Sequence, residues 1–302
     1  MRIRIVIAVL MILGSILLIS QPTHAQSTPE RRLRISPLRS ELVIEPGQAI
    51  KGSFSLKNTG STMLRVNLSA EEFTVTNDQY DYAFQPKSPI NKWVNFAENN
   101  ITIDADQTYT ADYLISVPIG AEPGGKYFSL FASALPTVNN GITSVDRVGS
   151  LVYLTVPGAI TKTGELVSLN SPIISTGAIR WSASIRNSGS AHFRSQHDAT
   201  VTTLWNTDVS TSTSSKLILP ASIRLLQGTI DSPKWLGIYK IYYNFELGDN
   251  PSTQQSRYIV YLPLAQSFLA LGIMLLFITL IIGASRRRKK LVRLRNRSID
   301  KA

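Results

Sequence analysis

The sequence predicts an all-β protein that consists of two β-sandwich domains followed by one C-terminal transmembrane α-helix. Three observations lead to this prediction. Apolar and polar residues alternate in several segments between residues 50 and 261. Turn-forming Gly, Pro and Asn residues separate those segments, and a long uncharged stretch, residues 262–284, precedes a basic cluster. Alternation with a period of two is typical of half-buried strands, whereas an apolar stretch of this length is typical of a membrane-spanning helix.

Residues 1–25 have the composition of a signal peptide. Arg2 and Arg4 precede an apolar run over residues 5–19, and the small residue Ala25 closes a short polar stretch. This order of segments is typical of a secretory signal and predicts cleavage before Gln26. An uncleaved N-terminal anchor is the alternative. In either case we expect residues 26–261 to lie outside the membrane.

The first domain is predicted over residues 26–158. Its clearest alternating segments are residues 50–57, 64–69 and 109–117, and turn residues at 45–47, 58–60 and 122–125 separate strands. The run of residues 148–157 is predicted as the last strand of this domain. Short strands at this spacing, with no amphipathic helix between them, indicate a sandwich of the immunoglobulin-like type.

The second domain is predicted over residues 159–261. Residues 179–186 and 239–247 alternate strictly, and Trp181 falls on the apolar side of its strand, where we expect it in the core. The polar, low-complexity residues 207–215 are predicted as a mobile loop, with a domain linker as the alternative. Residues 248–254 are predicted as a turn-rich segment that leads to the final strand.

Residues 262–284 are predicted as the membrane anchor and residues 285–302 as a basic cytoplasmic tail. At about 1.5 Å per residue, the uncharged stretch is long enough to cross a hydrocarbon core of about 30 Å. The basic cluster behind it fixes the orientation, because cytoplasmic flanks carry an excess of Lys and Arg. Two groups are therefore predicted at the membrane interface: the aromatic residues Tyr258 and Tyr261, and the cluster Arg286, Arg287, Arg288, Lys289 and Lys290.

The composition excludes several classes of function. The formal net charge is +11, but residues 286–302 carry nine Lys or Arg against the single Asp300, and residues 1–25 carry two Arg. Residues 26–285 hold 20 basic and 19 acidic residues, so the external part is nearly neutral and no nucleic-acid partner is predicted. The chain has no cysteine, which excludes disulfides and thiolate metal sites. No cofactor is predicted.

Several motifs resemble those of one bacterial family. In the first domain these are EPGQ (45–48), KNTG (57–60), KWVNF (92–96) and EPGGKYFSLFAS (122–133); in the second they are IRNSGSAHF (185–193), LILPASIR (217–224) and WLGIYKIYYNFELG (235–248). Their order, between a signal peptide and a C-terminal anchor, resembles the WxL-interacting cell-surface proteins of Gram-positive bacteria. The resemblance implies a surface-anchored scaffold. Its first domain would contact peptidoglycan, and its second domain a host or WxL-type partner.

Three aromatic residues are candidates for contact with a ligand or partner: Tyr80, Tyr82 and Trp93. Exposed aromatic rings stack on sugars and anchor protein partners, and core packing is the alternative for each of the three. His192 is predicted at the surface, and its spacing from His197 puts the two on opposite faces of a strand. The external part is therefore poorly supplied for a histidine-based triad or zinc site.

Three hypotheses of function follow. The leading one is a non-enzymatic, single-pass bacterial surface protein that binds a cell-wall component or another surface protein. The second is a chaperone-like assembly or adhesion protein that pairs a partner strand at an open sheet edge. The third, a wall hydrolase, lacks a catalytic constellation in the sequence, so we expect the protein not to be an enzyme.

Overall fold

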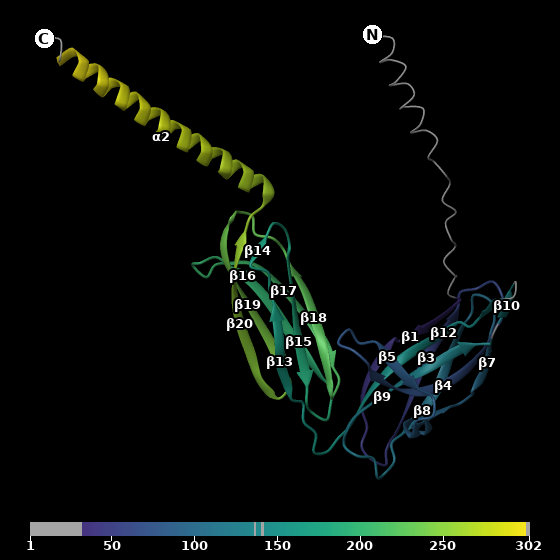
Figure 1. Cartoon of the computed structure of the whole chain (residues 1–302). Coiled ribbons are helices and arrows are strands. Elements are labelled where there is room, and N and C mark those ends of the chain that lie inside the picture. The colour runs from purple at the N-terminus through teal and green to yellow at the C-terminus, as the bar shows by residue number, and fades with distance from the viewer. Residues whose placement is uncertain (1–31, 136, 140–141, 300–302) are drawn as a thin grey trace, which may run out of the picture.

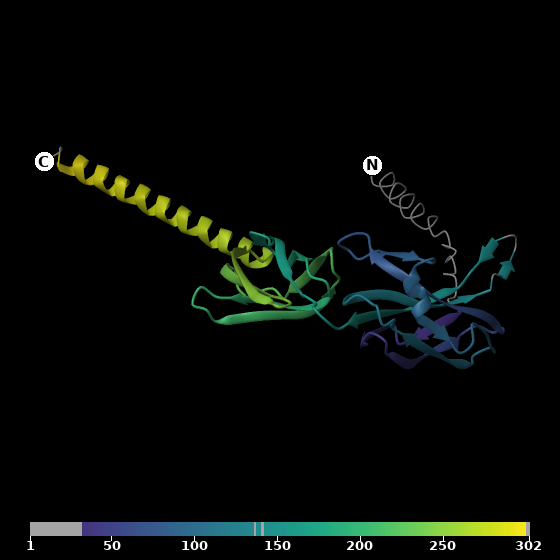
Figure 2. The same ribbon diagram turned by 90° about the horizontal axis from the view of Figure 1, so that it is seen from below.

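The computed structural model describes residues 32–135, 137–139 and 142–299, and the predicted signal peptide lies outside this part. Two β-sandwiches follow one another in the chain, and a single long helix follows the second (Figure 1). The predicted fold class, all-β with one C-terminal helix, is confirmed. The two views agree that the helix leaves the second sandwich on the side away from the first (Figure 2).

The first sandwich packs two sheets against each other. One sheet has the strand order β1-β3-β8-β6, and the other has the order β2-β12-β9-β4-β5, with β7 also paired to β4; β10 and β11 form a separate hairpin. The elements are β1 (Leu33–Ser36), β2 (Arg39–Val43), β3 (Ala49–Asn58), β4 (Leu64–Val75), β5 (Tyr82–Gln85), the 3₁₀ helix η1 (Pro89–Trp93), β6 (Val94–Phe96), β7 (Asn100–Ile103), β8 (Thr108–Ser116), β9 (Gly124–Ala134), β10 (Thr137–Asn139), β11 (Ile142–Ser144) and β12 (Arg147–Val156).

Alternation along the strands builds the core of this sandwich. Leu64, Val66 and Leu68 of β4 are all buried, and Arg65 between them is exposed. The facing sheet contributes Phe54 of β3 and its neighbours in β8. Each strand thus gives one face to the core, as the period of two predicted.

The second sandwich also has two sheets, with the strand orders β13-β15-β18 and β14-β20-β19-β16-β17. Seven residues, 157–163, separate its first strand from the end of β12, and the predicted boundary between residues 158 and 159 lies among them. The strands are β13 (Gly164–Asn170), β14 (Ile174–Ser175), β15 (Ile179–Asn187), β16 (Phe193–Thr202), β17 (Asp208–Ile218), β18 (Ser222–Ile230), β19 (Gly237–Leu247) and β20 (Asn250–Tyr261).

Trp181 lies at the centre of the second core, as predicted. It is 4% exposed, and its ring lies 5.4 Å from that of Tyr243 and 5.8 Å from that of His197. Gly228 of the neighbouring strand β18 is paired with Trp181, and a Cβ at Gly228 would meet the indole ring at 2.5 Å. The bare backbone of Gly228 therefore makes the room that the indole occupies.

Two predictions about the second sandwich were wrong. Residues 207–215 are not a mobile loop, because β17 starts at Asp208 and pairs with β16 through Ile218. The turn-rich segment is also shorter than predicted: the chain turns at Gly248 and Asp249, and β20 starts at Asn250. Both errors have the same physical cause, since strands whose side chains face water on both sides carry no apolar alternation.

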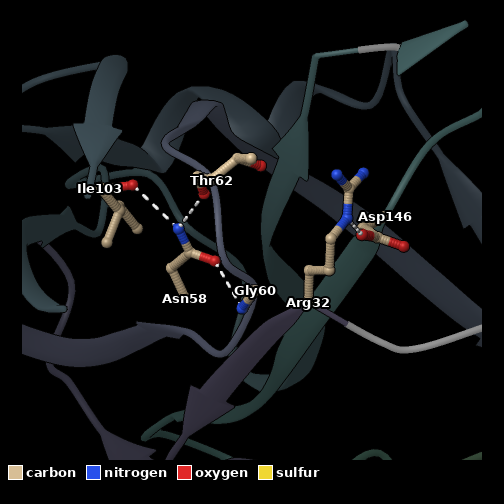
Figure 3. A network of polar contacts seen from close by, with 6 residues as sticks. All are labelled: Arg32, Asn58, Gly60, Thr62, Ile103 and Asp146. Carbon is tan, nitrogen blue, oxygen red and sulfur yellow. Dashed lines mark hydrogen bonds and ion pairs between the residues drawn. The ribbon is translucent and has the colours of Figure 1, made fainter. Parts of the chain in front are cut away.

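A buried asparagine closes the same turn in each sandwich. Asn58 is fully buried, and its side-chain amide donates to the carbonyl oxygens of Thr62 (2.8 Å) and Ile103 (3.1 Å), while its Oδ1 accepts from Gly60 N at 2.9 Å (Figure 3). Asn187 repeats this pattern in the second sandwich and accepts from Gly189 N at 2.9 Å. The Asn-x-Gly turns predicted from the sequence are thus also hydrogen-bonding centres.

The C-terminal helix α2 runs from Leu264 to Ile299. It starts two residues later than the predicted anchor and continues helically through the predicted tail, including residues 286–290. The stretch Leu264–Ile282 is long and apolar enough to cross a membrane, and none of it is buried against the rest of the protein. Only Leu262 and Pro263 separate it from β20.

Candidate functional site

The two sandwiches meet at a junction centred on Tyr80. Tyr80 belongs to the loop before β5 in the first sandwich, yet it is only 5% exposed. Its hydroxyl accepts a hydrogen bond from Leu219 N (2.8 Å) and lies 3.0 Å from Ser222 Oγ, and both partners belong to the second sandwich. The main chain is joined beside it, where Leu225 N donates to Asp78 O at 2.8 Å.

The hydrogen-bond directions at Tyr80 follow from the donors present. Ser222 Oγ donates its single proton to Leu219 O at 2.7 Å. Tyr80 must therefore donate to Ser222 while it accepts from Leu219, so its hydroxyl uses both its donor and an acceptor position. Burial raises the pKa of Tyr80, which keeps the phenol protonated as a donor.

The aromatic ring of Tyr80 is held as firmly as its hydroxyl. The guanidinium carbon of Arg224 lies 3.7 Å from the ring centroid, which is cation–π geometry. Tyr80 has a φ of 72°, a left-handed conformation that is unfavourable for a residue with a bulky side chain. The turn between β4 and β5 holds this conformation, since Tyr80 N donates to Asn77 O at 3.2 Å and Thr76 N donates to Asp81 O at 2.9 Å.

An aromatic cluster of the first sandwich surrounds this contact. Phe73, Tyr80 and Tyr153 are buried together with Leu217 and Leu219 of the second sandwich. The partly buried residues that pack against them are Val75, Tyr82, Phe84, Tyr127 and Leu151. We call these ten residues the junction cluster. Through these contacts the second sandwich covers part of the outer face of the sheet β2-β12-β9-β4-β5.

His192 also lies in the junction, so its predicted surface position was wrong. The hydroxyl of Tyr127 accepts from His192 N at 3.1 Å and lies 3.1 Å from its Nδ1. Burial lowers the pKa of His192, with a smaller opposing effect from Glu41. Beside it, Glu41 of the first sandwich and Arg194 of the second form an ion pair. Gly125 N donates to Ser190 O at 2.9 Å and completes the contact between the sandwiches.

The three candidate aromatic residues have different surroundings in the structure. Tyr80 is buried against its own second domain, which corrects its prediction as an exposed ligand contact. Tyr82 is half-buried in the junction cluster, and its hydroxyl lies 3.4 Å from that of Tyr153, too far for a strong hydrogen bond. Trp93 ends η1 and packs, half-buried, against the first core. Packing, the alternative reading, describes all three better than an exposed binding surface.

The residues predicted at the membrane interface also differ from one another. Tyr258 is 61% exposed, near the start of α2. Tyr261 is 5% exposed and packs in the second core, so its predicted role in an interfacial belt was wrong. The basic residues 286–290 lie on α2 directly after the apolar stretch, and their interfacial role stays a prediction.

A hollow of about 650 Å³ lies on three strands of the first sandwich. Lys51, Ser53, Asn95 and Asp112 are exposed on one face of these strands, whereas the half-buried rings of Phe96 and Tyr113 point to the other face and pack against Phe54 of the core. The lining residues are Lys51, Gly52, Ser53, Asn95, Phe96, Ala97, Asp112, Tyr113 and Leu114. Exposed charged, amide and hydroxyl groups on one face of a sheet can donate hydrogen bonds to a polar ligand and accept them from it.

The junction could have been recognised from one feature of the sequence. In β9, residues Phe128 to Ala132 are buried without a break, and in β12 so are Val152 to Leu154. A continuous apolar run in a strand indicates burial on both faces, whereas alternation indicates one. The hollow, by contrast, left no such pattern, because its lining comes from three strands that are distant in the sequence.

The described residues contain no group of three His, Asp or Glu side chains that could hold a metal ion. His197 is 2% exposed in the second core, and burial lowers its pKa. His192 is engaged in the junction.

Comparisons with known proteins found similar solved structures but no relative by sequence. No protein-family model and no curated protein matches the chain. The class 5 fimbriae chaperone CfaA is similar in structure, with 10% identity, coverage of 76% of this chain and 100% of that one, and a TM-score of 0.39. A chain of the CsuC–CsuE chaperone–tip adhesion subunit complex from Acinetobacter baumannii is 14% identical, with coverage of 76% of this chain and 99% of that one and a TM-score of 0.36. A protein of unknown function from Porphyromonas gingivalis W83 is 17% identical, with coverage of 76% of this chain and 99% of that one and a TM-score of 0.30. At identities and TM-scores this low, neither a partner nor an activity carries over to this chain.

Proposed function

We propose that this chain is a non-enzymatic binding scaffold, anchored by α2 in the cell membrane, with both sandwiches outside the cell and the basic end in the cytoplasm. Its ligand is a cell-wall component such as peptidoglycan, and a WxL-type surface protein is the alternative partner. The orientation rests on the basic cluster behind the apolar stretch. The apolar surface of Leu264–Ile282, unburied by the rest of the protein, supports the anchor.

The junction is the observation that carries the proposal. A scaffold has to present its binding surface at a defined place, and the contacts of Tyr80 tie the first sandwich to the one that bears the helix. The first sandwich is thereby held on the side away from α2 (Figure 2). The hollow over β3, β6 and β8 is the surface we assign to the ligand, because Lys51, Asn95 and Asp112 lie exposed on the same face of these strands and can form hydrogen bonds with the hydroxyl and amide groups of peptidoglycan.

Retention by purified peptidoglycan tests this function. The full-length protein in detergent micelles should sediment with insoluble peptidoglycan, and the double substitution Lys51→Glu and Asp112→Lys in the hollow should reduce the retained fraction at least about tenfold, a loss typical of removing two polar contacts. The matched control is Lys92→Glu, an exposed lysine outside the hollow. Equal retention of both variants, or none of the wild type, would contradict the assignment.

One observation favours a second candidate, pairing with a partner strand. β17 is an edge strand of 11 residues that pairs only with β16 among the described strands. Between Val209, where a β-bulge interrupts its pairing, and Lys216 it carries only Ser and Thr, without the charge or proline that usually protects an edge. Under this alternative, Thr213→Lys would abolish capture of a partner protein and leave peptidoglycan retention unchanged.

A further inference from the structure

Large apolar side chains gather, exposed, at one end of the second sandwich. Trp205 is 87% exposed, Trp235 72% and Ile173 76%. Leu204, Leu236, Ile238, Ile174 and Tyr258 are exposed as well. We call these eight residues the helix-end face. Tryptophan side chains are rarely this exposed in a soluble domain, so a group of them indicates a surface that another phase or molecule covers.

Strand register places these residues around the base of α2. Thr202 lies opposite Asp208 and Lys240, so the turn with Leu204 and Trp205 is beside the start of β19. Gly237 lies opposite Tyr261, the last residue before the helix connection. Ile174 lies opposite Val260. Three segments distant in the sequence therefore meet where the helix begins, at the opposite end of the sandwich from the junction.

Hydrogen bonds hold the main chain of the two loops that carry Trp205 and Trp235. In the first turn, Thr203 N donates to Thr207 O at 2.9 Å, and Asn206 takes a left-handed φ of 59°. In the second loop, the buried side chain of Tyr239 donates its hydroxyl proton to Trp235 O at 2.9 Å. The exposure of both indole rings is therefore a feature of the folded loops.

Gln266 joins this face to the helix. Its Oε1 accepts from Leu236 N at 2.8 Å, and its Nε2 donates to Lys234 O at 2.7 Å. These bonds explain why a polar amide stands in the first turn of an otherwise apolar helix. They also fix the depth of Trp235 relative to the start of the apolar stretch.

We propose that the helix-end face rests in the interfacial layer of the same bilayer that α2 crosses. The inference rests on the proposed membrane anchoring and adds that the second sandwich is itself a membrane-contacting domain. Continuity with the helix identifies the occupant, because only Leu262 and Pro263 separate the sandwich from an apolar stretch of membrane-spanning length. Indole rings favour the membrane–water interface, where the ring is buried and its N–H stays hydrated.

The charges near the face indicate which lipid is required. The eight residues of the helix-end face carry no charge, and the charged residues near it have both signs, such as Lys234 and Lys240 beside Asp208 and Asp231. Contact through uncharged apolar rings needs no anionic headgroup. Phosphatidylcholine alone should therefore support it.

Site-directed spin labelling of the full-length protein in phosphatidylcholine nanodiscs tests the proposal. The chain has no native cysteine, so single labels can be placed at Leu204→Cys and Leu236→Cys in the face. Ser252→Cys, exposed at the opposite end of the sandwich, is the matched control, and Ile273→Cys reports on the helix. Collision with oxygen, which concentrates in lipid, is compared with collision with a water-soluble nickel complex.

We expect labels at 204 and 236 to favour oxygen at least about threefold over the label at 252, in line with interfacial burial of an amphipathic surface. If they match the label at 252 while the label at 273 is in lipid, the contact between the helix-end face and the bilayer is refuted, but the membrane anchor is supported. If the label at 273 is also in water, the proposed anchoring itself fails. As a check without labels, brominated phosphatidylcholine should quench the wild-type tryptophan fluorescence, and the double substitution Trp205→Phe and Trp235→Phe should remove most of that quenching. Unquenched wild-type fluorescence would also refute the contact between the helix-end face and the bilayer.

Discussion

Removal of a single oxygen, in Tyr80→Phe, should weaken the junction measurably. The hydroxyl is the partner of Leu219 N, and Leu219 is 2% exposed, so the substitution leaves a buried N–H without an acceptor. Ser222 keeps its hydrogen bond to Leu219 O. The cost is therefore that of one unpaired buried donor plus one lost hydrogen bond, about 2 kcal/mol.

Tyr82→Phe is the matched control, because it removes the same atom from a neighbouring ring. The hydroxyl of Tyr82 lies 3.4 Å from that of Tyr153 and makes no strong hydrogen bond. We expect a loss below about 0.5 kcal/mol, as for substitutions that remove no buried partner.

Urea unfolding of the full-length protein in micelles, followed by far-UV circular dichroism, measures both variants. A double-substitution cycle with Ser222→Ala separates the junction from other effects: the Tyr80 and Ser222 losses should be non-additive by at least about 0.5 kcal/mol, as for side chains in direct contact. Equal losses for Tyr80→Phe and Tyr82→Phe, or strict additivity in the cycle, would refute the hydrogen-bond directions that we derive for Tyr80.

Three further outcomes follow from buried groups. Asn58→Ala should cost about 2–4 kcal/mol in the same unfolding assay, because it leaves buried carbonyl oxygens without their donor; a loss below about 1 kcal/mol would contradict this role. Gly228→Ala should cost about 1–3 kcal/mol by forcing a Cβ against the indole ring across the sheet, whereas Gly177→Ala, which meets nothing within 4 Å, should stay within about 0.5 kcal/mol. Burial lowers the pKa of His192 and His197, so the unfolded chain binds protons that the folded chain does not; stability should be complete above about pH 6.5 and fall as the pH drops below it. The thermal midpoint should therefore fall between pH 7.5 and pH 5.5, and less so in His192→Gln; an unchanged midpoint in the wild type would contradict the sign.

Strict alternation made the fold predictable from the sequence. In β15, Ile179, Trp181, Ala183 and Ile185 are all buried, and in β19 every second residue from Tyr239 to Leu247 is buried too. Such strands have one face on the core and one toward water, and the alternation of apolar and polar residues along the sequence reflects this difference. β17 was missed because its Ser and Thr side chains face water on both sides, so only its pairing with β16 defines it as a strand.

The functional surfaces were less predictable because they depend on contacts between segments far apart in the chain. Tyr80 has the same local sequence whether or not Leu219, 139 residues later, lies on it. Trp205 and Trp235 are separated by two strands and are related only through the register at the helix end. Local composition identified the apolar helix correctly, but it could not show that Gln266 ties this helix to the sandwich.

That the two sandwiches stand above the membrane as one body is tested most directly by a pulsed EPR distance between them. Spin labels at Thr110→Cys in β8 and Thr213→Cys in β17 lie on exposed positions of different sandwiches, in a chain with no native cysteine. In nanodiscs the distance distribution should be a single narrow peak, and Tyr80→Ala, which removes the ring under Arg224, should broaden it. A broad distribution in the wild-type protein would contradict a fixed junction.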